Sequence, residues 1–362
     1  MPRFNNQTKS ALPFLNRLGA WITGLSAALH PGSFALVMAT GIISNALFLE
    51  GYQKLSGLLL YVNTLAYAWL AILLTLRALK FPQAIWSDLT DPRAVFSFFT
   101  LIAANGVFGA GLHLRGAEAE ALGLWLLSLA MWLLLIYLGF AVMTFRSTAI
   151  RADAAHGGWL LAIVGSESLV ILGALIAPSA GASGPSVFVL IHMLWGVGIG
   201  LYAVLVTIIA FRIFFLATVP DDLTPMLWVV MGAAAISTNA GSTLLLKDSG
   251  LPPLTFTRPF IEGVTLILWA WAAWWIPLLL LFGVWKHAVC RAPLTYTPLL
   301  WGIVFPLGMF ALASLRLSLA AHFSPLRTIS LAMLWISVAA WAATFAALLA
   351  VAWRGFRNCG EM

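Results

Sequence analysis

Residues 264–285 read VTLILWAWAAWWIPLLLLFGVW, and no charged side chain occurs between Glu262 and Lys286. A membrane-spanning helix needs about 20 mostly apolar residues, so this stretch predicts a helix that crosses a bilayer. The chain as a whole has the same character, because 62% of its 362 residues are hydrophobic and only 9% are charged. Soluble domains have roughly a quarter charged residues. This composition excludes a soluble enzyme, a nucleic-acid-binding module and a disordered chain.

Working outward from this stretch, apolar runs bounded by charge, Pro or Gly predict ten membrane-spanning helices. They lie at roughly 31–50, 55–79, 93–114, 121–145, 158–178, 186–211, 225–246, 260–285, 298–320 and 327–353. Runs of this length exclude the alternating strands of an outer-membrane barrel. Ten helices fill the chain, so we expect a single all-α transmembrane domain over 1–362, with short tails at about 1–28 and 354–362. No removable signal peptide is expected at the N-terminus.

The distribution of Lys and Arg predicts how these helices are oriented. With ten helices, 13 of the 19 basic residues fall on the side that holds both termini, and 6 fall on the other side. Basic loops stay in the cytoplasm. Both termini are therefore predicted to be cytoplasmic, and the net charge of +7 is not interpreted as a sign of a nucleic-acid partner.

The ten segments are of two alternating kinds. Trp is concentrated in the even-numbered segments, whereas the middles of the odd-numbered segments carry small and weakly polar residues. Gly41 and Asn45 are four residues apart in the first segment, as are Asn105 and Gly109 in the third, and this spacing places each pair on one helix face. The alternation predicts five helical hairpins whose odd helices face inward around a central pore. The alternative is that Gly and Ala merely allow tight packing.

Four stretches together resemble a known family. They are HPGSFALVMATGIISNAL (30–47), WVVMGAAAISTNAGS (228–242), LILWAWAAWWIPLLLLFGVWKH (266–287) and LLWGIVFPLGMFALAS (299–314). In their order and spacing, the chain from about 28 to 350 is similar to the tellurite-resistance/C4-dicarboxylate transporter family. That family also includes fungal malate permeases, sulfite efflux pumps and plant slow anion channels.

The resemblance implies a protomer of five hairpins in membrane lipid, a central pore lined by the odd helices, and a homotrimer. It also implies that a phenylalanine on the ninth helix plugs the pore, and the matching position is Phe305, followed by Pro306. A proline inside a helix removes one backbone hydrogen bond. An aromatic ring beside it could close the path by excluding water. The alternative is that Phe305 is an ordinary packing residue.

Polar and small residues in the middles of the odd segments are expected to line the substrate path. They are Thr40, Gly41, Asn45, Asn105, Ser166, Ser237, Thr238, Asn239 and Gly308. Neutral donors suit weak, reversible handling of anions, and the alternative role is hydrogen bonding between helices.

Two charged residues lie within odd segments. Arg316 would attract anions near an outer pore mouth, or its side chain could extend to the membrane interface. Glu167 would repel anions unless it is protonated or paired, so proton coupling and a buried pair with an arginine are both open. We do not find a place for Glu167 in the family pattern.

These features predict transport of small anions across a membrane, such as a C4-dicarboxylate like malate or an inorganic anion. Efflux of sulfite or tellurite-related oxyanions is an alternative, and an intramembrane enzyme and a non-transporting scaffold are alternatives of other classes. No catalytic, cofactor or metal site is predicted, because the six histidines lack metal-ligand spacing and no nucleotide-binding loop occurs. The expected location is the inner membrane of a bacterium.

Overall fold

The computed structural model describes residues 19, 21–146, 156–247 and 250–361. Within these residues, ten helices are long and apolar enough to cross a membrane, which confirms the predicted number. They span Pro31–Leu49, Gln53–Lys80, Val95–His113, Glu118–Phe145, Gly157–Ser179, Gly181–Phe215, Pro225–Leu246, Arg258–Val289, Pro298–Ala320 and Pro325–Gly355. No strand occurs in the described part of the chain, so the all-α fold class is confirmed.

Five helices form an inner layer. They are α2 (Ala35–Leu49), α5 (Phe99–His113), α7 (Leu161–Ile176), α9 (Val229–Leu246) and α12 (Trp301–Ala320). Each packs on the next in chain order and α12 packs on α2, so the five helices close into a ring. Between 72% and 100% of the residues in their most apolar stretches are buried. These small-residue helices therefore face inward, as their sequences predict.

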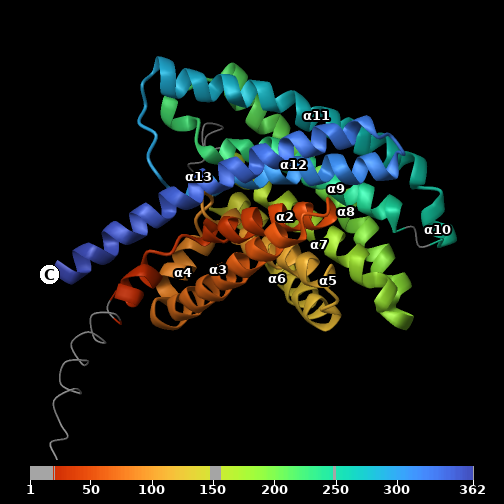
Figure 1. The fold of residues 1–362 in the computed structure, drawn as a ribbon, viewed down its shortest axis with the longest axis horizontal. Helices are drawn as coiled ribbons and strands as arrows, with labels where there is room; N and C mark the ends of the chain where they lie inside the picture. Colours follow the sequence, from red (N-terminus) through yellow and green to blue (C-terminus); the bar gives the residue numbers. More distant parts are fainter. Residues whose placement is uncertain (1–18, 20, 147–155, 248–249, 362) are drawn as a thin grey trace, which may run out of the picture.

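Five longer helices form an outer layer around the ring (Figure 1). They are α3 (Gln53–Lys80), α6 (Glu118–Phe145), α8 (Gly184–Phe215), α11 (Arg258–Val284) and α13 (Pro325–Glu361). Each packs against the ring helix that precedes it in the chain, which gives five hairpins. Only 11% to 33% of their most apolar stretches is buried. Their exposed apolar side chains, including Trp271, Trp274 and Trp353, have the character of a lipid-facing surface.

All five ring helices begin in the same way. A 3-10 turn precedes each of them, at Pro31–Phe34, Val95–Phe98, Gly157–Leu160, Pro225–Trp228 and Pro298–Leu300. Three of these turns start with proline, whose fixed φ suits the first position of a helix. The five turns contact one another in the same cyclic order as the ring helices. They therefore lie together on one side of the molecule, which we call the basic face.

An even number of spans returns the chain to the face where it starts, so both ends of the described chain lie on the basic face. α13 remains helical to Glu361, so the residues of the predicted tail up to Glu361 continue the last helix beyond the candidate span, which ends at Gly355. Most of the predicted tail 1–28 lies outside the described residues, as do the basic residues Arg3, Lys9, Arg17 and Arg151.

Candidate functional site

A small cavity of about 20 Å³ lies inside the helix ring. It is lined by Ile42, Asn45, Gly106, Val107, Ala110, Leu114, Ser168, Ile171, Ile236, Asn239, Met309, Leu312 and Arg316. All five ring helices contribute to this lining. A water molecule needs roughly 10–15 Å³ of such space. The cavity is therefore a narrow space on the ring axis with room for about one water, and we call it the axial cavity.

Arg316 is the one charged residue in the lining of the axial cavity as the structure describes it. Its Nη1 donates to Thr243 Oγ1 at 3.1 Å, and its Nε has no hydrogen-bond partner. Within the described residues, no carboxylate lies within 4.0 Å of this guanidinium. A buried cation without a counter-ion is costly, because neither water nor an acid compensates its charge. An anion in the axial cavity would compensate it.

Two asparagines bring amide groups to the same cavity. Asn45 Nδ2 donates to the Val107 carbonyl at 2.9 Å, while its Oδ1 has no partner. Asn239 Nδ2 contacts Met309 Sδ at 3.5 Å, a weak acceptor, and its Oδ1 is also without a partner. The two unpaired amide oxygens are acceptors and would bind a donor such as water, whereas the weakly held Nδ2 of Asn239 is the amide donor that an anion could use.

Phe305 lies one helical turn from the axial cavity on the side of the basic face. Phe305, Met309, Leu312 and Arg316 are spaced by four, three and four residues along α12, so they share one helix face. The Phe305 side chain is 2% exposed. Phe305 is therefore buried on the cavity-facing side of α12, between the level of the axial cavity and the start of the helix at the basic face.

Helices α9 and α12 pack closely beside Phe305. A Cβ atom on Gly232 of α9 would lie 2.8 Å from Pro306 Cγ of α12, so only glycine fits there. Pro306 lies within α12 and has no amide hydrogen to donate to the preceding turn. The two helices thus pack closely next to Phe305.

A second and larger cavity of about 380 Å³ opens at the basic face, where the 3-10 turns meet. It is lined by His30, Gly32, Arg93, Ser97, His156, Gly158, Arg212, Asp221, Asp222, Thr224, Met226 and Leu299. We call it the vestibule. Its charged groups are two arginines and two aspartates, of which Arg212 and Asp222 form an ion pair with an Nη2–Oδ1 distance of 2.6 Å. With both histidines neutral, the formal charges of the lining cancel.

Two ring helices begin with the same motif, His-x-Gly, at residues 30–32 and 156–158. The Gly32 amide donates to His30 Nδ1 at 3.0 Å. The Gly158 amide donates to His156 Nδ1 at 3.1 Å. A nitrogen that accepts a hydrogen bond carries no proton, so both neutral rings hold their proton on Nε2. Each histidine therefore caps its helix in the uncharged form.

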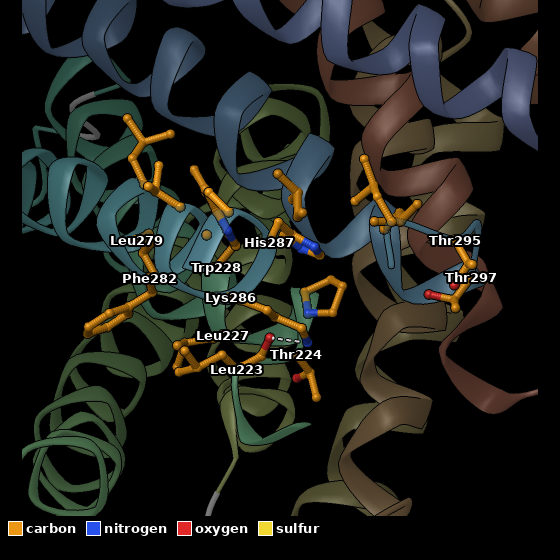
Figure 2. Close-up of a pocket in the computed structure, with 18 of the residues that line it drawn as sticks. Leu223, Thr224, Leu227, Trp228, Leu279, Phe282, Lys286, His287, Thr295 and Thr297 are labelled. Atoms are coloured by element: carbon orange, nitrogen blue, oxygen red, sulfur yellow. Dashed lines mark hydrogen bonds between the residues drawn. The ribbon is translucent and has the colours of Figure 1, made fainter. Parts of the chain in front are cut away.

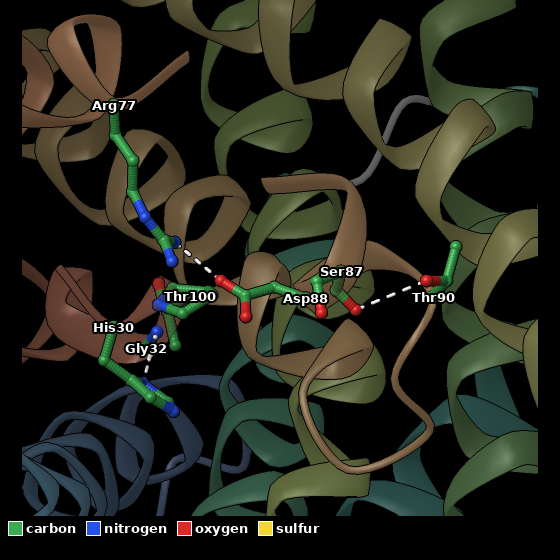
Figure 3. Close-up of polar contacts among 8 residues, drawn as sticks. His30, Gly32, Arg77, Ser87, Asp88, Thr90 and Thr100 are labelled. Atoms are coloured by element: carbon green, nitrogen blue, oxygen red, sulfur yellow. Dashed lines mark hydrogen bonds and ion pairs between the residues drawn. The ribbon is translucent and has the colours of Figure 1, made fainter. Parts of the chain in front are cut away.

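The His30 cap lies beside an ion pair that joins α3 to the short helix α4 (Pro82–Leu89), as Figure 3 shows. Arg77 Nη1 and Asp88 Oδ2 are 2.6 Å apart. Burial lowers the pKa of His30, the Asp88 carboxylate opposes this shift, and Arg77 reinforces it. The net effect is a lowered pKa, which keeps the His30 cap uncharged.

Burial also lowers the pKa of His156. Hydrogen bonding to the Arg93 backbone and the charge of Asp91 oppose this shift, whereas the charges of Arg212 and Arg93 reinforce it. Both histidines of the vestibule therefore resist protonation in the folded protein.

This arrangement predicts a loss of stability in acid. Between the ordinary histidine pKa of 6.5 and the lowered pKa in the fold, the unfolded chain binds more protons than the folded chain. Stability is therefore complete above that window and falls as the pH falls through it. We expect the unfolding temperature to drop between pH 7.5 and pH 5. The drop should be smaller in the double variant His30→Asn/His156→Asn, since asparagine keeps a side-chain oxygen that accepts the amide bond. Thermal unfolding in detergent measures this.

The exposed His322 at the end of α12 offers the matched control. His322→Asn should retain the pH dependence of the wild type. An equal acid sensitivity in the double variant and the wild type would show that the caps do not cause it.

Three of the predicted path residues line the axial cavity: Asn45, Asn239 and Arg316. Three others donate or accept hydrogen bonds toward the outer layer. Thr40 accepts from Trp341 Nε1 of α13 at 2.9 Å, and Asn105 accepts from Tyr67 of α3 at 2.9 Å. Ser166 accepts from Trp132 of α6 at 2.7 Å. Each of these three bonds joins a ring helix to the outer helix of the preceding hairpin around the ring, and none of the three side chains lines the cavity.

The predicted glycines and Thr238 also lie in packing positions. A Cβ on Gly41 would lie 2.8 Å from Asn63 Nδ2, and a Cβ on Gly308 would lie 2.9 Å from Ile42 Cγ2, so both glycines allow close helix packing. Thr238 Oγ1 donates to a carbonyl of its own helix. Gly41 and Gly308 therefore serve close helix packing, and Thr238 bonds within its own helix.

Glu167 lies on the outer side of α7. Its Oε1 accepts from Ser237 Oγ at 3.4 Å, and a Cβ on Gly198 of α8 would overlap the same oxygen. Its neighbour Ser168, which the sequence analysis does not single out, lines the axial cavity instead. Within the described residues, Glu167 has no ion-pair partner. The structure thus places this carboxyl group between α7, α8 and α9, outside the axial cavity.

Comparison with known proteins identifies the architecture. The family model described as voltage-dependent anion channel, SLAC1, matches residues 28–349. The chain is 26% identical over 322 residues to an uncharacterized transporter of Methanocaldococcus jannaschii, covering 86% of this chain and 91% of that protein. It is also 38% identical over 149 residues to an uncharacterized membrane protein of Mycobacterium tuberculosis, covering 41% of this chain and 75% of that protein.

These relatives point to transport rather than to enzymatic chemistry, and the ten apolar helices make the chain an integral membrane protein. Among the described residues, no group of three or more His, Cys, Asp or Glu side chains could hold a metal ion. The match over 28–349 includes all five ring helices and their outer partners, and it shows that the chain belongs to the SLAC1 family of voltage-dependent anion channels.

Proposed function

We propose that the chain conducts small anions along the axis of its helix ring and that Phe305 closes this path. The observation that carries the proposal is Arg316, a buried cation in the axial cavity without a carboxylate partner among the described residues. Such a group attracts an anion and rejects a cation at the same position. Asn239 Nδ2, which donates to the weak acceptor Met309 Sδ, would add a neutral donor to this weak site.

The path would run through three levels. Anions would collect in the vestibule, where the first turns of five helices present backbone N–H groups. They would pass Phe305 when its ring moves, and reach Arg316 in the axial cavity. A path that holds an ion weakly at several levels allows it to leave as well as to enter.

The inner membrane of a bacterium, with the basic face in the cytoplasm, is the proposed location. The division of basic residues, 13 to 6, supports this orientation. We also propose a homotrimer, as the family resemblance implies, in which each protomer has its own ring of five inner helices.

Inorganic anions should pass in preference to malate. The axial cavity is narrow and offers one buried cation, whereas a C4-dicarboxylate has two carboxylates to compensate. We expect chloride and nitrate flux in proteoliposomes to exceed malate flux by roughly tenfold, a difference of about 1.4 kcal/mol in barrier height. Sulfite belongs in the same panel because oxyanion efflux is the alternative function. The panel is measured with and without a pH gradient, against protein-free liposomes. Malate flux equal to or above chloride flux would favour dicarboxylate transport, and no anion flux from any vesicle would contradict the proposal.

Proton coupling through Glu167 is not expected, because its carboxyl group lies outside the axial cavity. Glu167→Gln keeps the size of the side chain and the contact with Ser237. We expect chloride flux within about twofold of the wild type and no change in its dependence on a pH gradient. Loss of acid-stimulated uptake in this variant would restore a coupling role for Glu167.

A further inference from the structure

A third cavity lies at the basic face but outside the helix ring. It has a volume of about 580 Å³ and lies between the 3-10 turn that precedes α9, the end of α11 and the segment that leads into α12 (Figure 2). Its walls include Leu227 and Trp228 on one side and Leu279 and Phe282 on another. The axial cavity and this groove share no lining residue. We call it the lateral groove.

The lateral groove is apolar along most of its length and basic at one end. Lys286 and His287 lie in the π-helical turn that ends α11, at the basic face. Lys286 Nζ donates to the Leu223 carbonyl at 3.0 Å, which holds the ammonium group at the rim. In the part of the chain that the structure describes, no Asp or Glu lines the groove, and no carboxylate lies within 4.0 Å of Lys286. The positive charge at the rim is therefore not neutralised by the protein.

The surroundings of the groove belong to the lipid-facing surface. Leu280 and Val284 of α11, which line the groove, are 55% and 59% exposed. Trp285, at the start of the π-helical turn, is also exposed, and tryptophan prefers the boundary between lipid and water. The groove thus extends from the hydrocarbon region to the charged boundary of one leaflet.

We propose that the lateral groove binds one anionic phospholipid from the leaflet at the basic face. An acyl chain would lie along Leu279 and Phe282, and the phosphate would pair with Lys286. Charge complementarity selects this occupant, because an apolar slot that ends in an uncompensated ammonium group matches an anionic headgroup on an apolar chain. Basic pockets between helices on this side of a membrane bind such headgroups.

A lipid bound in the groove would lie against residues 224–228, which separate the groove from the vestibule. Thr224 lines both the groove and the vestibule, and its neighbours divide between them, with Met226 facing the vestibule and Leu227 facing the groove. The turn is packed tightly, since a Cβ on Gly302 of α12 would lie 3.0 Å from Met226 Sδ. Lipid in the groove would therefore stabilise the mouth of the vestibule.

The test measures lipid retention by the full-length protein with native mass spectrometry, and thermal stability in mixed micelles, with phosphatidylglycerol and phosphatidylcholine as probes. We expect phosphatidylglycerol to be retained and to raise the unfolding temperature more than phosphatidylcholine does. Lys286→Gln should weaken retention of phosphatidylglycerol roughly fivefold and abolish the preference. Lys54→Gln, an exposed lysine at the start of α3, is the matched control and should change neither measurement.

A second variant fills the slot without disturbing the fold. Gly283 lines the groove, and a Cβ placed there meets no atom within 4 Å. Gly283→Leu should reduce retention of both lipids, and leucine also favours the helix over glycine. Three results would overturn the proposal: equal retention of the two lipids by the wild type, equal stabilisation by inorganic phosphate, or a change of oligomeric state in Gly283→Leu with lipid retention intact. The last would show that a second copy of the chain occupies the groove.

Discussion

Phe305→Ala is expected to raise chloride flux in proteoliposomes by roughly tenfold or more, which corresponds to a barrier lowered by at least about 1.4 kcal/mol. The Phe305 ring is 2% exposed and lies on the same face of α12 as Met309 and Arg316, which line the axial cavity. In the proposed gate, removing the ring would join the axial cavity to the vestibule. Phe305→Leu retains part of the bulk and should give an intermediate flux. Stopped-flow or electrode measurement of chloride release provides the readout.

Phe310 is the matched control for this change. It lies on the same helix and is also 2% exposed, but its ring stacks on Trp269 of α11, with 5.8 Å between centroids, away from the axis. Either truncation removes a buried ring and costs stability, by about 3–5 kcal/mol in soluble cores. Only Phe305→Ala should raise the flux. Similar flux in both variants and the wild type, with folded protein in each, would assign Phe305 to packing.

The architecture follows from the sequence because two strong patterns agree. Apolar runs of about 20 residues give the number of helices, and the contrast between Trp-rich and small-residue runs gives their layer. Both patterns depend on whole segments, so single exceptions do not disturb them. The closed ring and its cyclic order depend on contacts between distant segments such as α12 and α2, which no local pattern encodes.

The direction of single side chains is harder to predict, because ring helices carry polar groups on several faces. Thr40 and Asn45 are five residues apart, which is about 140° around a helix, so they cannot both face the axis. Asn45 lines the axial cavity and Thr40 bonds to α13. In α7, rotations of about 100° and about 160° separate Ser168 from Glu167 and from Ser166. If one axis-facing residue of each helix were known, the other axis-facing residues could be predicted at spacings of three or four.

One motif in the sequence does indicate part of the vestibule: the repeated His-x-Gly. His30 and His156 stand alone at segment ends and lack metal-ligand spacing, but each is followed by glycine two positions later. The repeat of His-x-Gly at the start of two inner segments indicates a shared local structure, and the structure explains it as a pair of helix caps. The positions of Arg93 and Arg212 around these caps depend on tertiary packing.

Arg316→Gln is expected to lower chloride flux at least tenfold, because it removes the buried cation that compensates an anion in the axial cavity. Arg115→Gln is the matched control. It removes an arginine whose Nη2 donates to Ser56 Oγ at 2.6 Å and whose guanidinium lies 4.7 Å from the centre of the Phe48 ring, outside the cavity lining. Its flux should stay within about twofold of the wild type. Equal losses in the two variants would indicate a general effect of charge at this end of the molecule.

A measurement of stability separates binding from a structural role. A buried arginine without a counter-ion costs stability, so Arg316→Gln should unfold at the same or a higher temperature than the wild type in an anion-poor buffer. Chloride or nitrate should then raise the unfolding temperature of the wild type, since a ligand that binds only the folded state stabilises it. The variant should lack this response. A destabilised variant that retains the anion response would mean that Arg316 supports the fold through Thr243 and that the anion binds elsewhere on the ring axis.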